Sequence, residues 1–216
     1  MSTHAHKHTS YSTVEERINV TSHAMGFLLS IAALVLLVVK ANGALQIASV
    51  AVFASSMIAL YGSSTIYHGT THITRRSWLR TLDHAMIYVL IAGSYTPFAL
   101  LVLTGNTGWA IFGISWAMAI TGIVIKLYHT GRYDKISTAM YVFMGWVIVL
   151  AIKPLIDNMT SAGLAWLFAG GISYTVGALF YSIKKMPYGH AVFHVFVLLG
   201  SACHFVSVYW YVLAPN

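Results

Sequence analysis

Seven long apolar segments, separated by short polar or glycine-containing turns, make up most of the chain. A segment of about 20 apolar residues is long enough to cross the hydrocarbon core of a bilayer as a helix. The pattern therefore predicts an all-α protein, a polytopic bundle of seven transmembrane helices. The predicted spans are residues 20–39, 45–67, 83–103, 109–128, 138–152, 164–183 and 189–213.

The predicted spans leave little of the chain for anything else. Residues 1–19 are expected to form a polar cytoplasmic tail, and residues 20–216 a single transmembrane domain. The tail has no small-residue cleavage motif ahead of the first apolar run, so we expect no removable signal peptide. Seven spans of about 20 residues use about 140 residues, which leaves no room for a separate soluble domain.

The basic residues fall mainly on one side of the predicted bundle. Ten of the 12 lysines and arginines lie in the tail or around every second loop, whereas Lys40 and Lys153 lie on the other side. Cytoplasmic loops of membrane proteins are enriched in Lys and Arg. We therefore expect a multi-pass protein of the cell membrane, the inner membrane if the source is bacterial, with a cytoplasmic N-terminus and an external C-terminus.

Composition supports a membrane protein and excludes several other classes. Hydrophobic residues make up 58% of the 216 residues, and only 8% are charged, whereas soluble domains are roughly one quarter charged. Because the net charge of +7 comes from clusters that set topology, we expect no nucleic-acid partner. The single cysteine, Cys203, excludes an intrachain disulfide bond.

Three histidines and one aspartate occur at span ends that this topology brings to the same cytoplasmic side. His68 follows the second span, Asp83 opens the third, and His190 and His194 begin the seventh. The last two are four residues apart and share one helix face, a common way to offer two imidazoles to one metal. Ionisable groups at membrane depth are costly and generally functional. We therefore predict a metal site formed by His68, His190 and His194.

These residue types favour hydrolysis by a metal-bound water. Three imidazoles with a fourth position left for water form a catalytic zinc arrangement, and all-imidazole ligation suits Zn²⁺. Water bound to zinc loses a proton near neutral pH. We expect Asp83 to accept that proton or to orient the water. Ser64, one turn deeper than His68, is expected to hydrogen-bond to the water or to a developing oxyanion.

Other polar residues receive structural interpretations. The first span starts on the same side and brings Glu16, Asn19 and His23 into this layer, where we expect Glu16 and Asn19 to have a capping or supporting role. His204 lies about 15 Å beyond His194 along the helix, so we expect it to be a buried hydrogen-bonding residue outside the metal site. Pro97 is expected to kink the third span.

The chain resembles the hemolysin III proteins within the progestin and adipoQ receptor family. The resemblance covers nearly the whole chain from about Glu15 onward, and it rests on several motifs in a fixed order. These are Glu16-Arg17-Ile18-Asn19-Val20-Thr21-Ser22-His23, Ser64-x3-His68, Leu82-Asp83-His84 with Gly93-Ser94-Tyr95-Thr96-Pro97, and His190-x3-His194. The resemblance implies zinc held by three motif histidines, an aspartate that reaches the metal through water, and seven helices with a cytoplasmic N-terminus.

The wider group of similar membrane hydrolases, which includes alkaline ceramidases, implies hydrolysis of lipid amides. We therefore predict a zinc-dependent intramembrane hydrolase of lipid amides or esters, with membrane lipids as substrate or ligand. Two alternatives stay open: a non-enzymatic membrane sensor or regulator with structural zinc, and a hemolysin-type pore or transporter. The sequence leaves the oligomeric state undetermined.

Overall fold

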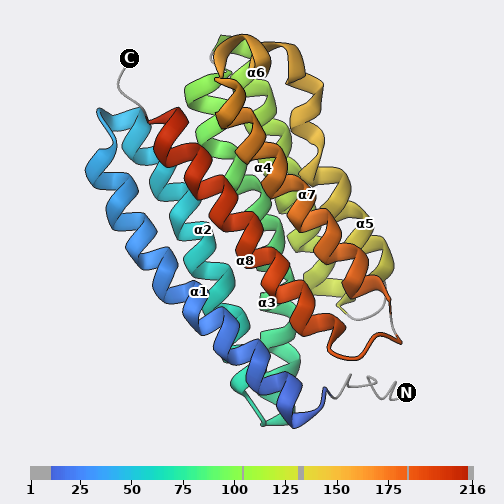
Figure 1. The fold of residues 1–216 in the computed structure, drawn as a ribbon. Coiled ribbons are helices and arrows are strands. Elements are labelled where there is room, and N and C mark those ends of the chain that lie inside the picture. Colours follow the sequence, from blue (N-terminus) through green and yellow to red (C-terminus); the bar gives the residue numbers. More distant parts are fainter. Residues whose placement is uncertain (1–10, 104, 131–133, 184, 214–216) are drawn as a thin grey trace.

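The computed structural model describes residues 11–103, 105–130, 134–183 and 185–213, which form a bundle of long helices (Figure 1). Within these residues, seven helical segments are long and apolar enough to cross a membrane, which confirms the predicted all-α class with seven spans. The helices are α1 (Thr13–Lys40), α2 (Ala44–Gly69), α3 (Ile73–Pro97), α4 (Gly105–His129), α5 (Asp134–Gly145), α6 (Ile152–Asn158), α7 (Ser161–Ser182) and α8 (Gly189–Ser207).

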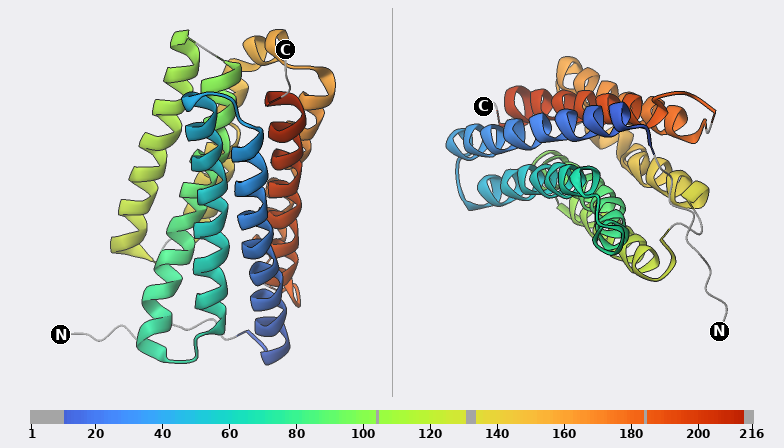
Figure 2. Two further views of the ribbon diagram at one scale, coloured as in Figure 1. Left: turned by 90° about the vertical axis from the view of Figure 1, so that its left-hand side faces the viewer. Right: turned by 90° about the horizontal axis from the view of Figure 1, so that it is seen from below.

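Consecutive spans are antiparallel, so α1, α3 and α8 begin at the end of the bundle where α2 ends (Figure 1). Helix α1 lies between α2 and α8, and α8 packs in turn on α7 (Figure 2). This arrangement brings the start of α1 beside the end of α2 and the start of α8. The cytoplasmic location of this end stays a prediction. Three of the basic residues that predict it, Lys7, Arg132 and Lys184, lie outside the described residues.

Large apolar side chains cover the outside of the bundle. Leu28 and Leu29 of α1, Leu150 of the fifth span and Leu179 of α7 are all more than half exposed. A soluble monomer rarely exposes contiguous apolar surface on this scale. The outer surface is therefore the one that lipid tails cover, and this agrees with the apolar length of the spans.

Helix α1 begins at Thr13, within the predicted polar tail, and not at residue 20. The Ser12 hydroxyl accepts a hydrogen bond from the Glu15 backbone N–H at 3.2 Å and caps the helix. Glu15 and Glu16 occupy the first turn, where the helix dipole favours acidic side chains. Hydropathy does not detect this polar turn. As a result, Glu16 lies in the first turn of α1. Residues 1–10 of the predicted tail lie outside the described residues.

Helix α3 also begins earlier than predicted, at Ile73, so the expectation that Asp83 opens the third span is wrong. The segment 73–82 is too basic to register as an apolar span, yet its residues form nearly three helical turns. Asp83 therefore lies about 15 Å along α3 by helix rise, away from the helix N-terminus. The helix dipole acts within the first turn only, and it does not account for a carboxylate at this position.

Two spans pass from α-helical to π-helical hydrogen bonding toward the opposite end of the bundle. The π-helical segment η1 (Phe98–Val102) follows Pro97 directly, and η3 (Val208–Val212) follows α8. At Pro97, where the sequence predicts a kink, the hydrogen-bonding pattern changes, and Leu103 N–H bonds to Phe98 O at 3.0 Å. The fifth span consists of α5, the 3₁₀ segment η2 (Val147–Ala151) and α6, and it is longer than the predicted 138–152.

Candidate metal centre

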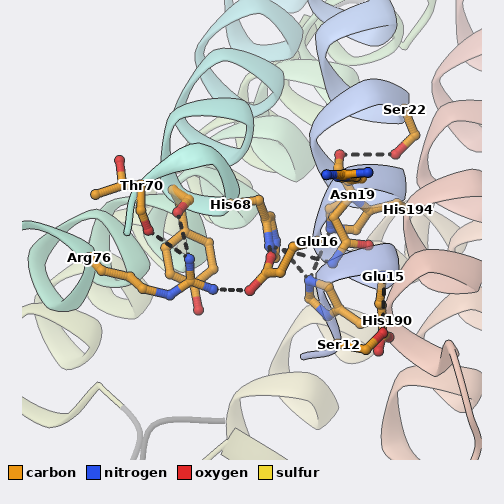
Figure 3. A network of polar contacts seen from close by, with 12 residues as sticks. Ser12, Glu15, Glu16, Asn19, Ser22, His68, Thr70, Arg76, His190 and His194 are labelled. Carbon is orange, nitrogen blue, oxygen red and sulfur yellow. Dashed lines mark hydrogen bonds and ion pairs between the residues drawn. The ribbon is translucent and has the colours of Figure 1, made fainter. Parts of the chain in front are cut away.

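Three buried histidines from α2 and α8 converge at one point inside the bundle (Figure 3). The Nε2 atoms of His190 and His68 are 3.1 Å apart, and those of His194 and His190 are 3.0 Å apart. One ring nitrogen from each of the three lies within 4.8 Å of the other two. The structure therefore brings together the three histidines that the sequence singled out.

The donor set fits a divalent cation. A tetrahedral ion with Zn–N bonds of about 2.0–2.1 Å separates its nitrogen ligands by roughly 3.4 Å, which is close to the separations here. His190 Nε2 faces the Nε2 atoms of both His68 and His194, and it carries either one proton or one lone pair, so it can form a normal hydrogen bond with only one of them. A cation that accepts a lone pair from each ring removes this conflict. The buried His68, His190 and His194 group could thus hold a metal ion.

His68 is oriented by contacts on its other ring nitrogen. Its Nδ1 lies 2.7 Å from Glu16 Oε2 of α1 and 3.5 Å from the Asn19 amide nitrogen (Figure 3). Because a carboxylate only accepts, Nδ1 carries the proton and donates it to Glu16. In the neutral imidazole, the Nε2 atom then keeps its lone pair, and it faces the two histidines of α8.

Asp83 and Ser64 lie beside the histidine group and face the same cavity. Asp83 is 5% exposed and Ser64 is fully buried, and both line a cavity together with His190 and His194. The Ser64 hydroxyl approaches the Asp83 carboxyl, although it makes no hydrogen bond of normal geometry to a described residue. Among the described residues, Asp83 is not one of the groups whose donor atoms converge at the metal position.

The rest of the cavity extends into the bundle between α3, α5, α7 and α8, and its lining is mainly apolar. Leu90, Phe168, Phe193 and Val197 contribute to this lining. His204, farther along α8, also faces the cavity, and its Nε2 donates to Leu167 O at 3.2 Å. His204 is therefore a buried hydrogen-bonding residue outside the histidine group, as predicted.

Gly170 of α7 makes room for the His204 ring. A Cβ atom at this position would lie 2.2 Å from His204 Cδ2, a distance that side chains do not tolerate. Small residues at helix–helix contacts let backbones approach closely in membranes. The close contact of α7 and α8 fixes one wall of the cavity.

Two aromatic rings stack on members of the histidine group, and the sequence does not predict these contacts. His23 of α1 stacks on His194, with ring centroids 3.5 Å apart and planes at 9°. Tyr11, just before α1, stacks on His190 with centroids 4.7 Å apart. Burial raises the pKa of the Tyr11 hydroxyl above its ordinary value, so the ring stays neutral. These two rings cover the histidine group on the side of α1.

One spacing pattern in the sequence indicates which residues of the first helix face the histidine group. Glu16, Asn19 and His23 are spaced by three and four residues, and a helix through them presents all three on one face. The predicted helix began only at residue 20, which separated Glu16 and Asn19 from His23. Once α1 begins at Thr13, the spacing becomes a polar stripe that faces the histidine group.

Comparison with known proteins identifies the family. The sequence pattern described as "Haemolysin-III related" matches residues 11–205. The chain is 45% identical over 202 residues to "Hemolysin-3" of Bacillus cereus, covering 92% of each chain. It is also 45% identical over 204 residues to the "Hemolysin-3 homolog" of Bacillus subtilis, covering 93% of this chain and 96% of the relative.

A more distant relative extends the comparison to animals. Human "Monocyte to macrophage differentiation factor" is 31% identical over 169 residues, covering 74% of this chain and 68% of the relative. The family match spans most of the chain and includes all the residues of the candidate metal centre. This chain belongs to the hemolysin III-related proteins of the progestin and adipoQ receptor family, and it is a multi-pass protein of the cell membrane.

Proposed function

We propose that this protein is a zinc-dependent hydrolase of lipid amides or esters that acts within the membrane. The observation that carries the proposal is the convergence of three buried imidazole nitrogens beside a carboxylate, at one end of a mainly apolar cavity. Three neutral ligands are typical of catalytic zinc, whereas structural zinc normally has four protein ligands. A zinc ion held there would supply an activated water and polarise the substrate carbonyl.

The chain's own residues have distinct tasks in this reaction. His68, His190 and His194 would hold the ion, and His190 and His194 also line the cavity. Asp83 accepts the proton of the attacking water and returns it to the leaving amine or alcohol. Ser64 donates its hydroxyl proton in a hydrogen bond to the carbonyl oxygen, where negative charge develops in the transition state.

The lining of the cavity supports a lipid as the substrate. Leu90, Phe168, Phe193 and Val197 form an apolar wall that suits a hydrocarbon chain. His190 and His194 line the cavity near the start of α8, at the end of the bundle where α1 and α3 also begin. A lipid whose chain lies along the apolar wall therefore has its amide or ester bond beside Asp83 and the histidine group.

Two observations favour the hydrolase over the two alternatives, a sensor with structural zinc and a pore or transporter. The described residues offer three converging ligands and not four, which favours an open catalytic position over a purely structural zinc in a sensor. The lining of the cavity is mainly apolar, which argues against a water-filled pore.

Metal removal tests the proposed activity. The purified protein with zinc is expected to release free fatty acid from at least one N-acyl amide or ester in a lipid panel. Chelator should abolish the release, and added zinc should restore it. Fatty acid is measured by mass spectrometry, and thermal melting is followed in the same samples. A protein that melts at a lower temperature in chelator, yet never hydrolyses any member of the panel, would refute the enzyme and leave the sensor.

A further inference from the structure

The three histidines of the metal centre differ in what their second ring nitrogens contact. His68 Nδ1 donates to Glu16 Oε2 at 2.7 Å. By contrast, Nδ1 of His190 and Nδ1 of His194 have no hydrogen-bond partner of normal geometry among the described residues. A carboxylate on the second nitrogen of a ligand histidine fixes its tautomer and ring orientation and raises its basicity. Within the described part of the chain, His68 is the one member of the group whose second ring nitrogen contacts a carboxylate.

Glu16 is itself held by an arginine from another helix. Its Oε1 accepts a hydrogen bond from Arg76 Nη2 at the start of α3 (Figure 3). Arg76 Nη1 also donates to the backbone oxygens of Thr70 at 2.8 Å and Tyr67 at 3.4 Å. Tyr67 and Thr70 lie on either side of His68 in the chain, so Arg76 binds the backbone on both sides of this histidine. The same arginine also orients the Glu16 carboxylate that contacts the His68 ring.

Burial separates this pair from ordinary surface ion pairs. The side chains of Glu16 and Arg76 are 19% and 15% exposed, and that of His68 is fully buried. Charges shielded from water interact more strongly than exposed ones. Three neutral imidazoles also leave the charge of a divalent ion uncompensated, and Glu16 brings a negative charge to the far side of one ligand.

We infer that Glu16 and Arg76 are positioning residues for the metal centre: Glu16 sets the tautomer and orientation of His68, and Arg76 holds Glu16 in place. Neither residue touches the metal position. The pair makes His68 ready to bind before the ion arrives, so its loss weakens metal binding and changes the ligand geometry. The inference rests on the metal site of the proposed function and does not depend on hydrolysis.

A matched pair of variants tests the role of Glu16. Glu16→Gln removes the charge and puts an amide next to His68, while Glu15→Gln makes the same change one residue away in the first turn of α1. We expect Glu16→Gln to weaken zinc binding by about 10–100-fold, the range found when such supporting partners are removed. Glu15→Gln should bind zinc like the wild type. Zinc affinity is measured on full-length protein by competition with a chromogenic chelator.

A second readout separates positioning from general stabilisation. Cobalt(II) replaces zinc and reports ligand geometry through its visible absorption. We expect Glu16→Gln to change this spectrum and Glu15→Gln to leave it unchanged. Arg76→Gln keeps the carboxylate but frees it, so it should also weaken zinc binding, whereas Arg75→Gln, the neighbouring arginine in the same turn of α3, should not. Arg76→Gln also carries the test if Glu16→Gln does not fold.

The outcomes are distinct. Wild-type zinc affinity and an unchanged cobalt spectrum in Glu16→Gln would overturn the inference even if the variant melts earlier, because the ion pair would then only join the helices. Failure of the wild-type protein to bind zinc or cobalt would refute the metal centre itself and the inference with it. Zinc binding that is weaker in Glu16→Gln than in the wild type, together with a wild-type protein that hydrolyses no lipid of the panel, would support the positioning role and refute only the enzyme.

Discussion

Replacing Asp83 with asparagine is expected to slow hydrolysis strongly while leaving the metal in place. The carboxylate is 5% exposed and faces the cavity beside His190 and His194, but it is not one of the converging metal ligands. Asparagine keeps the size of the side chain and cannot accept the proton of water at neutral pH. General-base catalysis contributes about 10²–10⁴-fold, so kcat for fatty acid release should fall by that factor.

Zinc content and a distant carboxylate provide the controls for Asp83. The zinc per chain in Asp83→Asn should equal that of the wild type, because the three imidazoles are intact. Asp157→Asn, an exposed position on α6 at the opposite end of the bundle, should keep the wild-type kcat. Full kcat in Asp83→Asn would contradict the role of Asp83 as a general base. Loss of zinc from this variant would instead indicate that Asp83 is a metal ligand.

Removal of one imidazole from α8 is expected to have the largest effect on metal binding. His194 is 1% exposed, and its Nε2 lies 3.0 Å from His190 Nε2. His194→Ala leaves only two ligands, so its zinc affinity should fall by more than the roughly 10–100-fold that supporting residues contribute. Zinc content, measured by mass spectrometry of purified protein, should drop from one ion per chain to near zero.

Two other histidines serve as controls for His194→Ala. His72 is exposed at the same end of the bundle, and His204 is buried on the same helix, bonded to Leu167 O. His72→Ala and His204→Ala should retain full zinc content, although His204→Ala leaves a space in the packing and should melt earlier. Zinc retained in His194→Ala, or lost in both controls, would remove His194 from the metal centre.

Apolar length was sufficient to predict the spans, and it failed where a helix continues through polar residues. The start of α8 at Gly189 was predicted correctly because the apolar segment and the helix begin together. The starts of α1 and α3 were missed because Ser12 caps a turn that contains two glutamates, and because Ile73 begins turns rich in arginine. Backbone hydrogen bonds form regardless of side-chain polarity, so a helix can extend beyond the apolar region.

The three histidines could be predicted because their positions depend only on helix periodicity and on the alternation of the spans. Asp83 lines the same cavity as His190 and His194, although it lies in the interior of α3 and not at its start, and its catalytic role stays a prediction. The contacts of Glu16 with His68 and of His23 with His194 depend on how α1 is rotated about its axis. Hydropathy says little about the rotation of a helix about its axis, so these contacts required the structure.

The central claim, that the imidazoles of α2 and α8 bind one zinc ion, is tested most directly by X-ray absorption at the zinc edge on purified wild-type protein. The account predicts one zinc per chain, with three imidazole nitrogens at about 2.0–2.1 Å and one further oxygen ligand. A zinc ion surrounded by oxygen ligands without imidazole scattering, or a protein that binds no zinc, would contradict it.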